Sequence, residues 1–161
     1  MTQPARCQKN SMEIKNKKII AIAEKDKSEK IEQILLSINP DFKSQVIFFE
    51  PARILKIKDL PEQENFILVF NGDQENVLNL LAELNFEKTS YGFSESSDFM
   101  ASDVNQTEGG ATFKLNYKGN SIPIWLVGNI NEEKIYYALA VICIGSSLGM
   151  NVLEIAEKLK K

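Results

Sequence analysis

The chain has 161 residues and a formal net charge of −3, from 19 Lys and Arg against 22 Asp and Glu, and it contains no histidine. The length fits one domain, and 43% hydrophobic with 25% charged residues is the composition of an ordinary globular protein. The absence of histidine excludes Ser-His and Cys-His nucleophilic catalysis and histidine metal ligands. Cys7 and Cys143 have no metal-type or disulfide-framework spacing, which favours a reducing cytoplasm as the setting.

The N-terminal end differs in character from the rest of the chain. Residues 1–30 hold eight basic side chains against four acidic ones, and no aromatic residue lies between the lysines. We therefore expect a solvated terminus and no nucleic-acid partner. Residues 1–15 show no periodicity and are expected to form a flexible tail, with Met12 as an alternative start, before a single domain at 16–161. The longest apolar run, Ile135–Ile144, is too short to cross a bilayer, so no membrane association is expected.

The predicted elements begin with a βαβ unit. The apolar, partly β-branched run Lys18–Ala23 predicts a strand buried on both faces. Apolar residues at helical spacing predict a helix at Lys27–Ile38, which Asn39-Pro40 ends because proline disfavours helical geometry in the residue before it. Gln45–Phe49 predicts a second buried strand. A strand, a helix and a strand of these lengths indicate a parallel sheet.

The next segment continues the alternation of helices and strands. A helix is predicted at Ala52–Leu60, and a third buried strand at Asn65–Phe70. Asp73 is expected to cap a helix at Gln74–Leu84, because aspartate is a favoured N-cap residue. Phe86–Phe93 predicts a fourth strand.

From residue 98 to 127 the hydrophobic period changes to two, which predicts an antiparallel meander. Its turns are expected at Gly109-Gly110 and Gly119-Asn120. Pro123 indicates that the last strand is an edge strand or contains a bulge, because proline cannot donate to a neighbouring strand. We expect Trp125 to pack in the core with the other aromatic residues of the strands.

Two helices follow, at Glu132–Leu148 and Val152–Lys160, with Asn131 and Asn151 as their N-caps and Gly149 between them. The fold class predicted from these elements is α/β: a mostly parallel sheet flanked by helices, with an antiparallel β meander.

The second half of the chain resembles the Mur ligases in the order of its motifs. These motifs are Tyr91–Glu95 (YGFSE), Asp98–Val104 (DFMASDV), Gly110–Leu115 (GATFKL), Ile135–Val141 (IYYALAV) and Leu148–Asn151 (LGMN). The resemblance covers roughly residues 61–160 and is to the family's central, ATP-binding domain. It is most like the branch that adds D-Ala-D-Ala to the peptidoglycan precursor, and it implies a shortened, P-loop-type version of that domain.

The resemblance implies a nucleotide site that has decayed. Family members bind ATP phosphates with a G-x-x-G-K-S/T loop, because glycines let backbone N–H groups converge on the anion. Lys27 and Ser28 resemble the K-S/T pair of that loop. Both glycines are absent, and Glu24 and Asp26 place negative charge where phosphates would lie. We therefore expect the phosphate cradle to be lost.

The resemblance also implies residues near the nucleoside. Asn71 and Asp73 resemble the family's N-A/G-D element, although a turn followed by an N-cap explains the same residues. Gly128 and Asn131 resemble the G-x-H-N-x-x-N element, from which the histidine is missing and in which Tyr137 replaces the second asparagine. Together with Lys27 and Ser28, these four residues are our candidate cofactor-binding residues, as vestiges of the family site. No catalytic or metal-ligating residue is predicted, and ATP and magnesium are expected only if the family activity survives.

Three hypotheses about function follow. The first is a fragment of a Mur ligase central domain, compacted from a three-domain enzyme, that is not catalytic alone and serves as a binding or regulatory module. The alternative is one chain of a split ATP-dependent amide ligase, in which another protein chain supplies the missing domains. The third is a scaffold that dimerises through a sheet edge or through its acidic C-terminal half.

Overall fold

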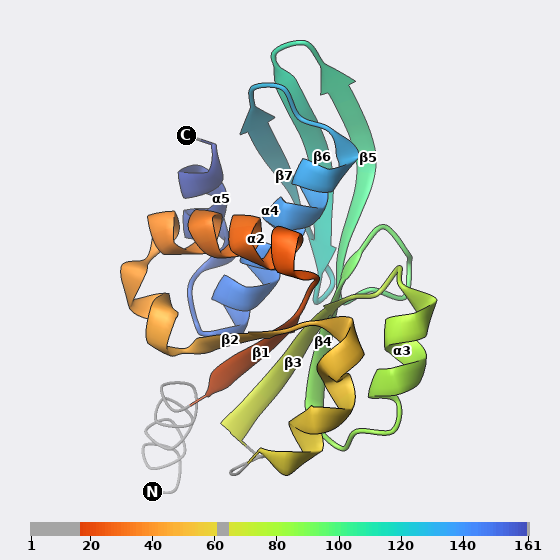
Figure 1. Cartoon of the computed structure of the whole chain (residues 1–161). Helices are drawn as coiled ribbons and strands as arrows, with labels where there is room; N and C mark the ends of the chain where they lie inside the picture. The colour runs from red at the N-terminus through yellow and green to blue at the C-terminus, as the bar shows by residue number, and fades with distance from the viewer. Residues whose placement is uncertain (1–16, 61–64, 161) are drawn as a thin grey trace, which may run out of the picture.

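The computed structural model describes residues 17–60 and 65–160 (Figure 1). The strands are β1 (Lys18–Ile22), β2 (Val46–Phe49), β3 (Phe66–Asn71), β4 (Glu87–Gly92), β5 (Phe99–Thr107), β6 (Gly110–Tyr117) and β7 (Asn120–Val127). The helices are α2 (Lys25–Ile38), α3 (Glu75–Leu81), α4 (Glu132–Ser147) and α5 (Val152–Leu159), with two 3₁₀ segments, η1 (Pro40–Ser44) and η2 (Pro51–Asp59). The predicted tail at 1–15 lies outside the described residues.

The described strands form one sheet in the order β2-β1-β3-β4-β5-β6-β7. Neighbours from β2 to β5 are parallel, whereas β5, β6 and β7 pair antiparallel. The predicted α/β class, with a mostly parallel sheet and an antiparallel meander, is therefore confirmed. The edge position of β7 also confirms the expectation from Pro123.

Helices cover both faces of the parallel part of the sheet, which gives three layers (Figure 1). In β1, Ile19 and Ala21 join the apolar cluster that contains α2, α4 and α5. Ile20 and Ile22 point the other way and join the cluster with η2 and α3. This alternation explains why the strand sequences are apolar at nearly every position, because successive side chains enter different cores.

The meander extends beyond these layers, so that only one of its faces is covered (Figure 1). In β7, Ile124 and Leu126 are buried, but Trp125 between them is 48% exposed. The prediction that Trp125 packs in the core is therefore wrong. Alternation places its side chain on the solvent side of an edge strand, where the Lys160 ammonium lies 5.2 Å from the ring centroid.

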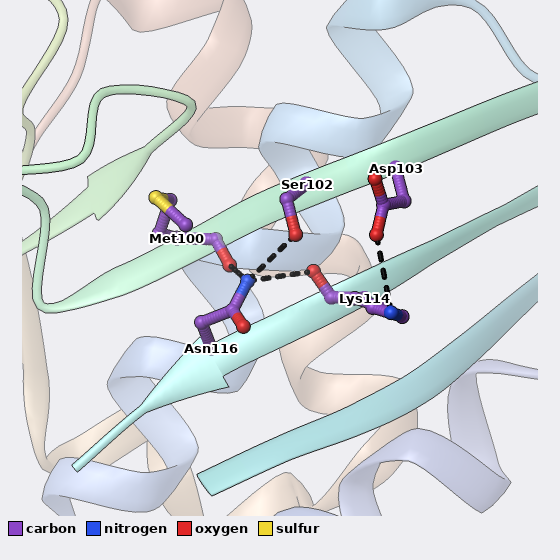
Figure 2. Close-up of polar contacts among 5 residues, drawn as sticks. All are labelled: Met100, Ser102, Asp103, Lys114 and Asn116. Atoms are coloured by element: carbon purple, nitrogen blue, oxygen red, sulfur yellow. Dashed lines mark hydrogen bonds and ion pairs between the residues drawn. The ribbon is translucent and has the colours of Figure 1, made fainter. Parts of the chain in front are cut away.

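A β-bulge in β5 bends the meander and is fixed by side chains of β6 (Figure 2). The bulge follows Ser102, and Asp103 within it has φ +52°. The Asn116 side-chain amide donates to the Ser102 hydroxyl at 2.8 Å and to the Met100 carbonyl at 3.2 Å. The Lys114 ammonium lies 3.2 Å from the Asp103 carboxylate.

The caps of the last two helices are as predicted. The Asn131 side chain accepts a hydrogen bond from the Lys134 backbone N–H, and Asn151 caps α5 in the same way. Gly149 has φ +95° at the end of α4, as expected of a C′ glycine. No helix among the described residues has the length and apolar character to span a membrane.

Two helix predictions are wrong in detail. The helix expected at 52–60 is the 3₁₀ segment η2, in which Ile54 and Ile57 are both fully buried, at the three-residue spacing of a 3₁₀ turn. The helix expected at 74–84 spans only Glu75–Leu81, with Gln74 at the N-cap and no side-chain cap. Asp73 does not cap this helix, because its carboxylate accepts hydrogen bonds from other parts of the chain, described below.

Candidate functional site

The candidate site lies at the carboxyl ends of the parallel strands. The sheet order changes direction at β1, which has β2 on one side and β3 on the other. In open α/β sheets, ligands bind in the crevice outside such a point. Here the crevice is a cavity of about 200 Å³ between the first turns of α2 and α4. Its polar lining consists of Glu24, Lys27, Asn71, Asp73, Gln74, Tyr91, Glu133, Tyr136 and Tyr137.

The connection from β1 to α2 is too short to be a phosphate-binding loop. Only Ala23 and Glu24 separate the two elements. The Ala23 N–H donates to the Phe49 carbonyl at 3.0 Å, and the Ser28 N–H donates to the Glu24 carbonyl at 2.8 Å as the first helical bond. The Ser28 hydroxyl donates to the Lys25 carbonyl at 2.9 Å. The backbone therefore passes directly from strand to helix, and Ser28 bonds within α2.

The Asp73 carboxylate connects three parts of the chain at the edge of the cavity. One oxygen, Oδ2, accepts from the Phe93 N–H at 2.8 Å and from the Tyr136 hydroxyl at 2.7 Å. The other, Oδ1, accepts from the Ser94 N–H at 3.0 Å. Asp73 thereby ties the end of β3 to the connection after β4 and to α4. Three donors to one carboxylate explain why this residue is not free to cap α3.

Two neighbours fit around this carboxylate. The Asn71 side-chain oxygen accepts from the Asp73 N–H at 2.9 Å, which forms the turn after β3. Gly92 leaves room on the other side, because a Cβ at this position would lie only 2.7 Å from an Asp73 oxygen. The Phe93 ring packs edge-to-face on the Tyr136 ring, with centroids 4.9 Å apart. The tyrosine-glycine-phenylalanine motif thus has a structural role.

A second aspartate fixes the start of β5. The Asp98 carboxylate accepts from the Ser90 N–H at 2.9 Å and from the Ser90 hydroxyl at 3.2 Å, and the Asp98 N–H lies 3.1 Å from the same hydroxyl oxygen. Strand β5 pairs with β4 only at Tyr91 and Gly92. The Asp98 carboxylate therefore accepts the hydrogen bond of the Ser90 backbone N–H at the point where β4 and β5 no longer pair.

Tyrosine hydroxyls close the cavity on the α4 side. The Tyr137 hydroxyl donates to the Glu133 carboxylate, one turn earlier in α4. Burial, and then the hydrogen bond to a carboxylate, raises the pKa of both Tyr136 and Tyr137. Burial also raises the pKa of Tyr91, which is 5% exposed. All three phenols are therefore neutral hydrogen-bonding groups at physiological pH.

The structure brings together some of the predicted site residues and separates others. Lys27, Asn71 and Asp73 line the cavity, whereas Ser28 is adjacent to it and bonds within α2. Gly128 and Asn131 lie outside it: Gly128 is an exposed residue with φ +106°, and Asn131 caps α4.

The sequence did not single out the other polar lining residues as site residues: Glu24, Gln74, Tyr91, Glu133, Tyr136 and Tyr137. For Tyr91, the available signal was its position at the carboxyl end of a predicted strand. Among the described residues, no group of three His, Cys, Asp or Glu side chains is placed to hold a metal ion.

The matched proteins are Mur ligases. No family model matches the chain. The UDP-N-acetylmuramate–L-alanine ligase of Chlorobaculum parvum is 32% identical over 78 residues, which are 48% of this chain and 17% of that ligase.

Solved structures with the same fold include Mur ligases. UDP-N-acetylmuramoylalanyl-D-glutamyl-2,6-diaminopimelate–D-alanyl-D-alanyl ligase from Acinetobacter baumannii superposes with a TM-score of 0.70 at 12% identity, over 93% of this chain and 47% of that one. The MurF ligase of Thermotoga maritima in complex with ADP gives a TM-score of 0.63 at 11% identity, over 88% and 48%. The chain thus spans about half the length of the solved ligases. The partial sequence match and the shared fold together show that the chain is similar to the central domain of the Mur ligases.

Proposed function

We propose that this Mur-ligase-like domain does not bind the phosphates of ATP, is not a ligase by itself, and acts as a binding module. The observation that carries the proposal is the two-residue connection between β1 and α2. Forming an acyl phosphate requires several backbone N–H groups and cations around the transferred phosphoryl group. A connection of Ala23 and Glu24 supplies no encircling loop, and the Glu24 carboxylate would repel a phosphate.

The size of the cavity supports the same conclusion. About 200 Å³ is below the roughly 300–1,000 Å³ of pockets that hold drug-sized ligands. Glu24, Asp73 and Glu133 line it against one cation, Lys27. A nucleoside triphosphate would thus meet a space that is both small and acidic.

The second candidate is one chain of a split ligase. The turn at Asn71 and the Asp73 carboxylate favour it, because both lie at the edge of the cavity. In this case, another protein chain would supply the phosphate-binding groups and the remaining ligase domains.

A titration with Mg-ATP tests the proposal. A ligand at a hundred times its Kd stabilises a protein by about 2.7 kcal/mol, which is about 5–11 °C in Tm for a domain of this size. We expect no saturable rise in Tm at millimolar Mg-ATP, and no difference between wild type and Lys27→Ala. Saturable stabilisation that Lys27→Ala removes, and that the exposed control Lys43→Ala keeps, would refute the proposal.

A further inference from the structure

Strand β7 is an edge of the described sheet, with β6 on one side and no described strand on the other (Figure 1). Just after β7, the Gly128 N–H donates to the Gly109 carbonyl at 3.0 Å. Because hydrogen-bonded and non-hydrogen-bonded pairs alternate along an antiparallel ladder, the even-numbered residues of β7 bond to β6. The odd-numbered residues direct their backbone groups away from the sheet, and they are Ser121, Pro123, Trp125 and Val127.

The end of β7 is the part of this edge that can pair with another strand. Pro123 has no N–H to offer, whereas Trp125 and Val127 each present an N–H and a carbonyl. The side chains of these two residues are 48% and 67% exposed. An exposed apolar edge strand is a template for pairing with another chain. Pairing at Trp125 and Val127 would supply partners to their outward backbone groups and cover both side chains.

Two hollows flank this end of β7, one on each face of the sheet. The inner hollow, of about 470 Å³, is lined by Leu126 and by apolar side chains of the helices and of the connection after β7: Ile34, Ile130, Ala138 and Leu159. The outer hollow, of about 320 Å³, is bordered by Trp125 and Val127 and by the polar side chains of Asn105, Thr107 and Thr112. Successive side chains of an added strand point to opposite faces of the sheet, so they would meet both hollows. Pockets for alternate side chains beside a free edge are the features by which proteins recognise a peptide through strand addition.

The charges around the hollows favour an acidic segment. Lys30 and Lys134 line the inner hollow, and the Lys160 ammonium lies 5.2 Å from the Trp125 ring centroid in the outer one. Among the described residues that line either hollow, Glu133 is the single acidic one, and its carboxylate accepts a hydrogen bond from the Tyr137 hydroxyl. A second copy of β7 would bring no acidic side chain, since residues 120–127 contain none. The charge pattern therefore favours a different protein as the partner.

We propose that the end of β7 binds an extended segment of a partner protein as an added strand. The backbone of this segment pairs with Trp125 and Val127, its apolar side chains enter the inner hollow, and its acidic side chains lie near the lysines. The inference rests on the proposed function only in taking this chain to be a binding module. Lys27 is not among the residues that line the two hollows, so Mg-ATP and the segment are tested separately.

A short synthetic peptide in which Glu and Leu alternate, acetylated and amidated at its ends, is the probe. Trp125 is the only tryptophan of the chain, so its fluorescence reports binding at the site directly. We expect a saturable change in this fluorescence. Amide hydrogen exchange at Trp125 and Val127 should slow when the peptide binds, whereas exchange at Leu126, which faces β6, should change less. Absence of saturable binding, or unchanged exchange at Trp125 and Val127 at saturation, would overturn the inference.

A peptide of the same sequence with methyl groups on alternate backbone nitrogens separates strand pairing from simple adhesion. It keeps every side chain but loses backbone donors, and it should bind about tenfold more weakly. In the protein, Lys30→Glu combined with Lys160→Glu should weaken binding of the unmethylated peptide about fivefold at low ionic strength, and the exposed control Lys43→Glu should not. Equal binding of the two peptides would refute strand addition, whatever the protein variants do.

Sedimentation of the protein without peptide tests the alternative occupant. We expect a monomer at all concentrations. A dimer in which exchange at Trp125 and Val127 slows as the concentration rises would assign the edge to a second copy and overturn the inference. The two proposals also fail separately. A peptide that does not bind refutes only this inference, whereas saturable Mg-ATP binding that depends on Lys27 refutes the proposed loss of phosphate binding.

Discussion

The Asp73→Asn variant tests whether the three-donor carboxylate holds the site together. Asparagine has the same shape, but its side-chain NH₂ group is a donor, so at least one of the Phe93 N–H, Ser94 N–H and Tyr136 hydroxyl donors loses its acceptor. Hydrogen bonds to charged groups contribute about 1.5–3 kcal/mol each. Because Asp73 is itself exposed, water compensates for part of the loss. We expect a loss of about 1–3 kcal/mol, or about 2–12 °C in Tm.

Urea and thermal unfolding of the wild type and four variants measure this effect. Tyr136→Phe, which removes one donor, should cost about 0.5–1.5 kcal/mol. The double variant should cost less than the sum, with a coupling of at least about 0.5 kcal/mol. Asp103→Asn is the matched control, because the Asp103–Lys114 ion pair is exposed on both sides and should contribute less than about 1 kcal/mol. Equal effects at the two aspartates, or strict additivity, would refute the reasoning.

Three further changes should affect stability in defined ways. Gly92→Ala should lower Tm by several degrees, because its Cβ would lie 2.7 Å from the Asp73 carboxylate, whereas Gly109→Ala, with no atom within 4 Å, should not. Burial raises the pKa of Tyr91 above its usual value near 10. The stability that the neutral phenol contributes is therefore complete below about pH 10 and is lost as the pH rises further. Between about pH 9 and 11, the urea midpoint should fall less in Tyr91→Phe than in wild type. Asn131→Ala should cost about 1 kcal/mol in thermal unfolding, because it removes the N-cap of α4.

The sequence predicted the elements well where one physical signal dominated. Burial on all sides requires apolar residues at nearly every position, and such runs predicted β1, β3 and the long helix α4. The N-caps at Asn131 and Asn151 were predicted from the capping preference of asparagine alone. Asp73 was misassigned because its partners in the connection after β4 lie 20 and 21 residues away, and no local rule foresees such donors. Trp125 was misassigned because its aromatic character was given more weight than the alternation with Ile124 and Leu126, which places it on the opposite face of the strand.

The candidate site was harder to predict, because its polar groups come from elements far apart in the sequence. Asn71 and Lys27 were singled out by motif, and both line the cavity. Tyr91 and Tyr136 were noted only as parts of the YGFSE and IYYALAV motifs, and the fold shows that both border the cavity. Gly128 and Asn131 were also singled out by motif, but the fold places both outside the cavity.

The presence of the second-half motifs and the proposed loss of the phosphate loop have a common physical explanation. The motif residues stabilise the fold directly: Asp98 replaces a strand partner of Ser90, and Gly92 admits the Asp73 carboxylate. Their loss would cost stability whether or not a ligand binds. Loop glycines, in contrast, contribute nothing to packing and carry a high entropic cost on folding. Replacing such a loop with a helix that begins at Lys25 adds intrahelical hydrogen bonds, such as that from the Ser28 N–H to Glu24. A chain selected for a stable fold without ATP chemistry would therefore keep the first set of residues and lose the second.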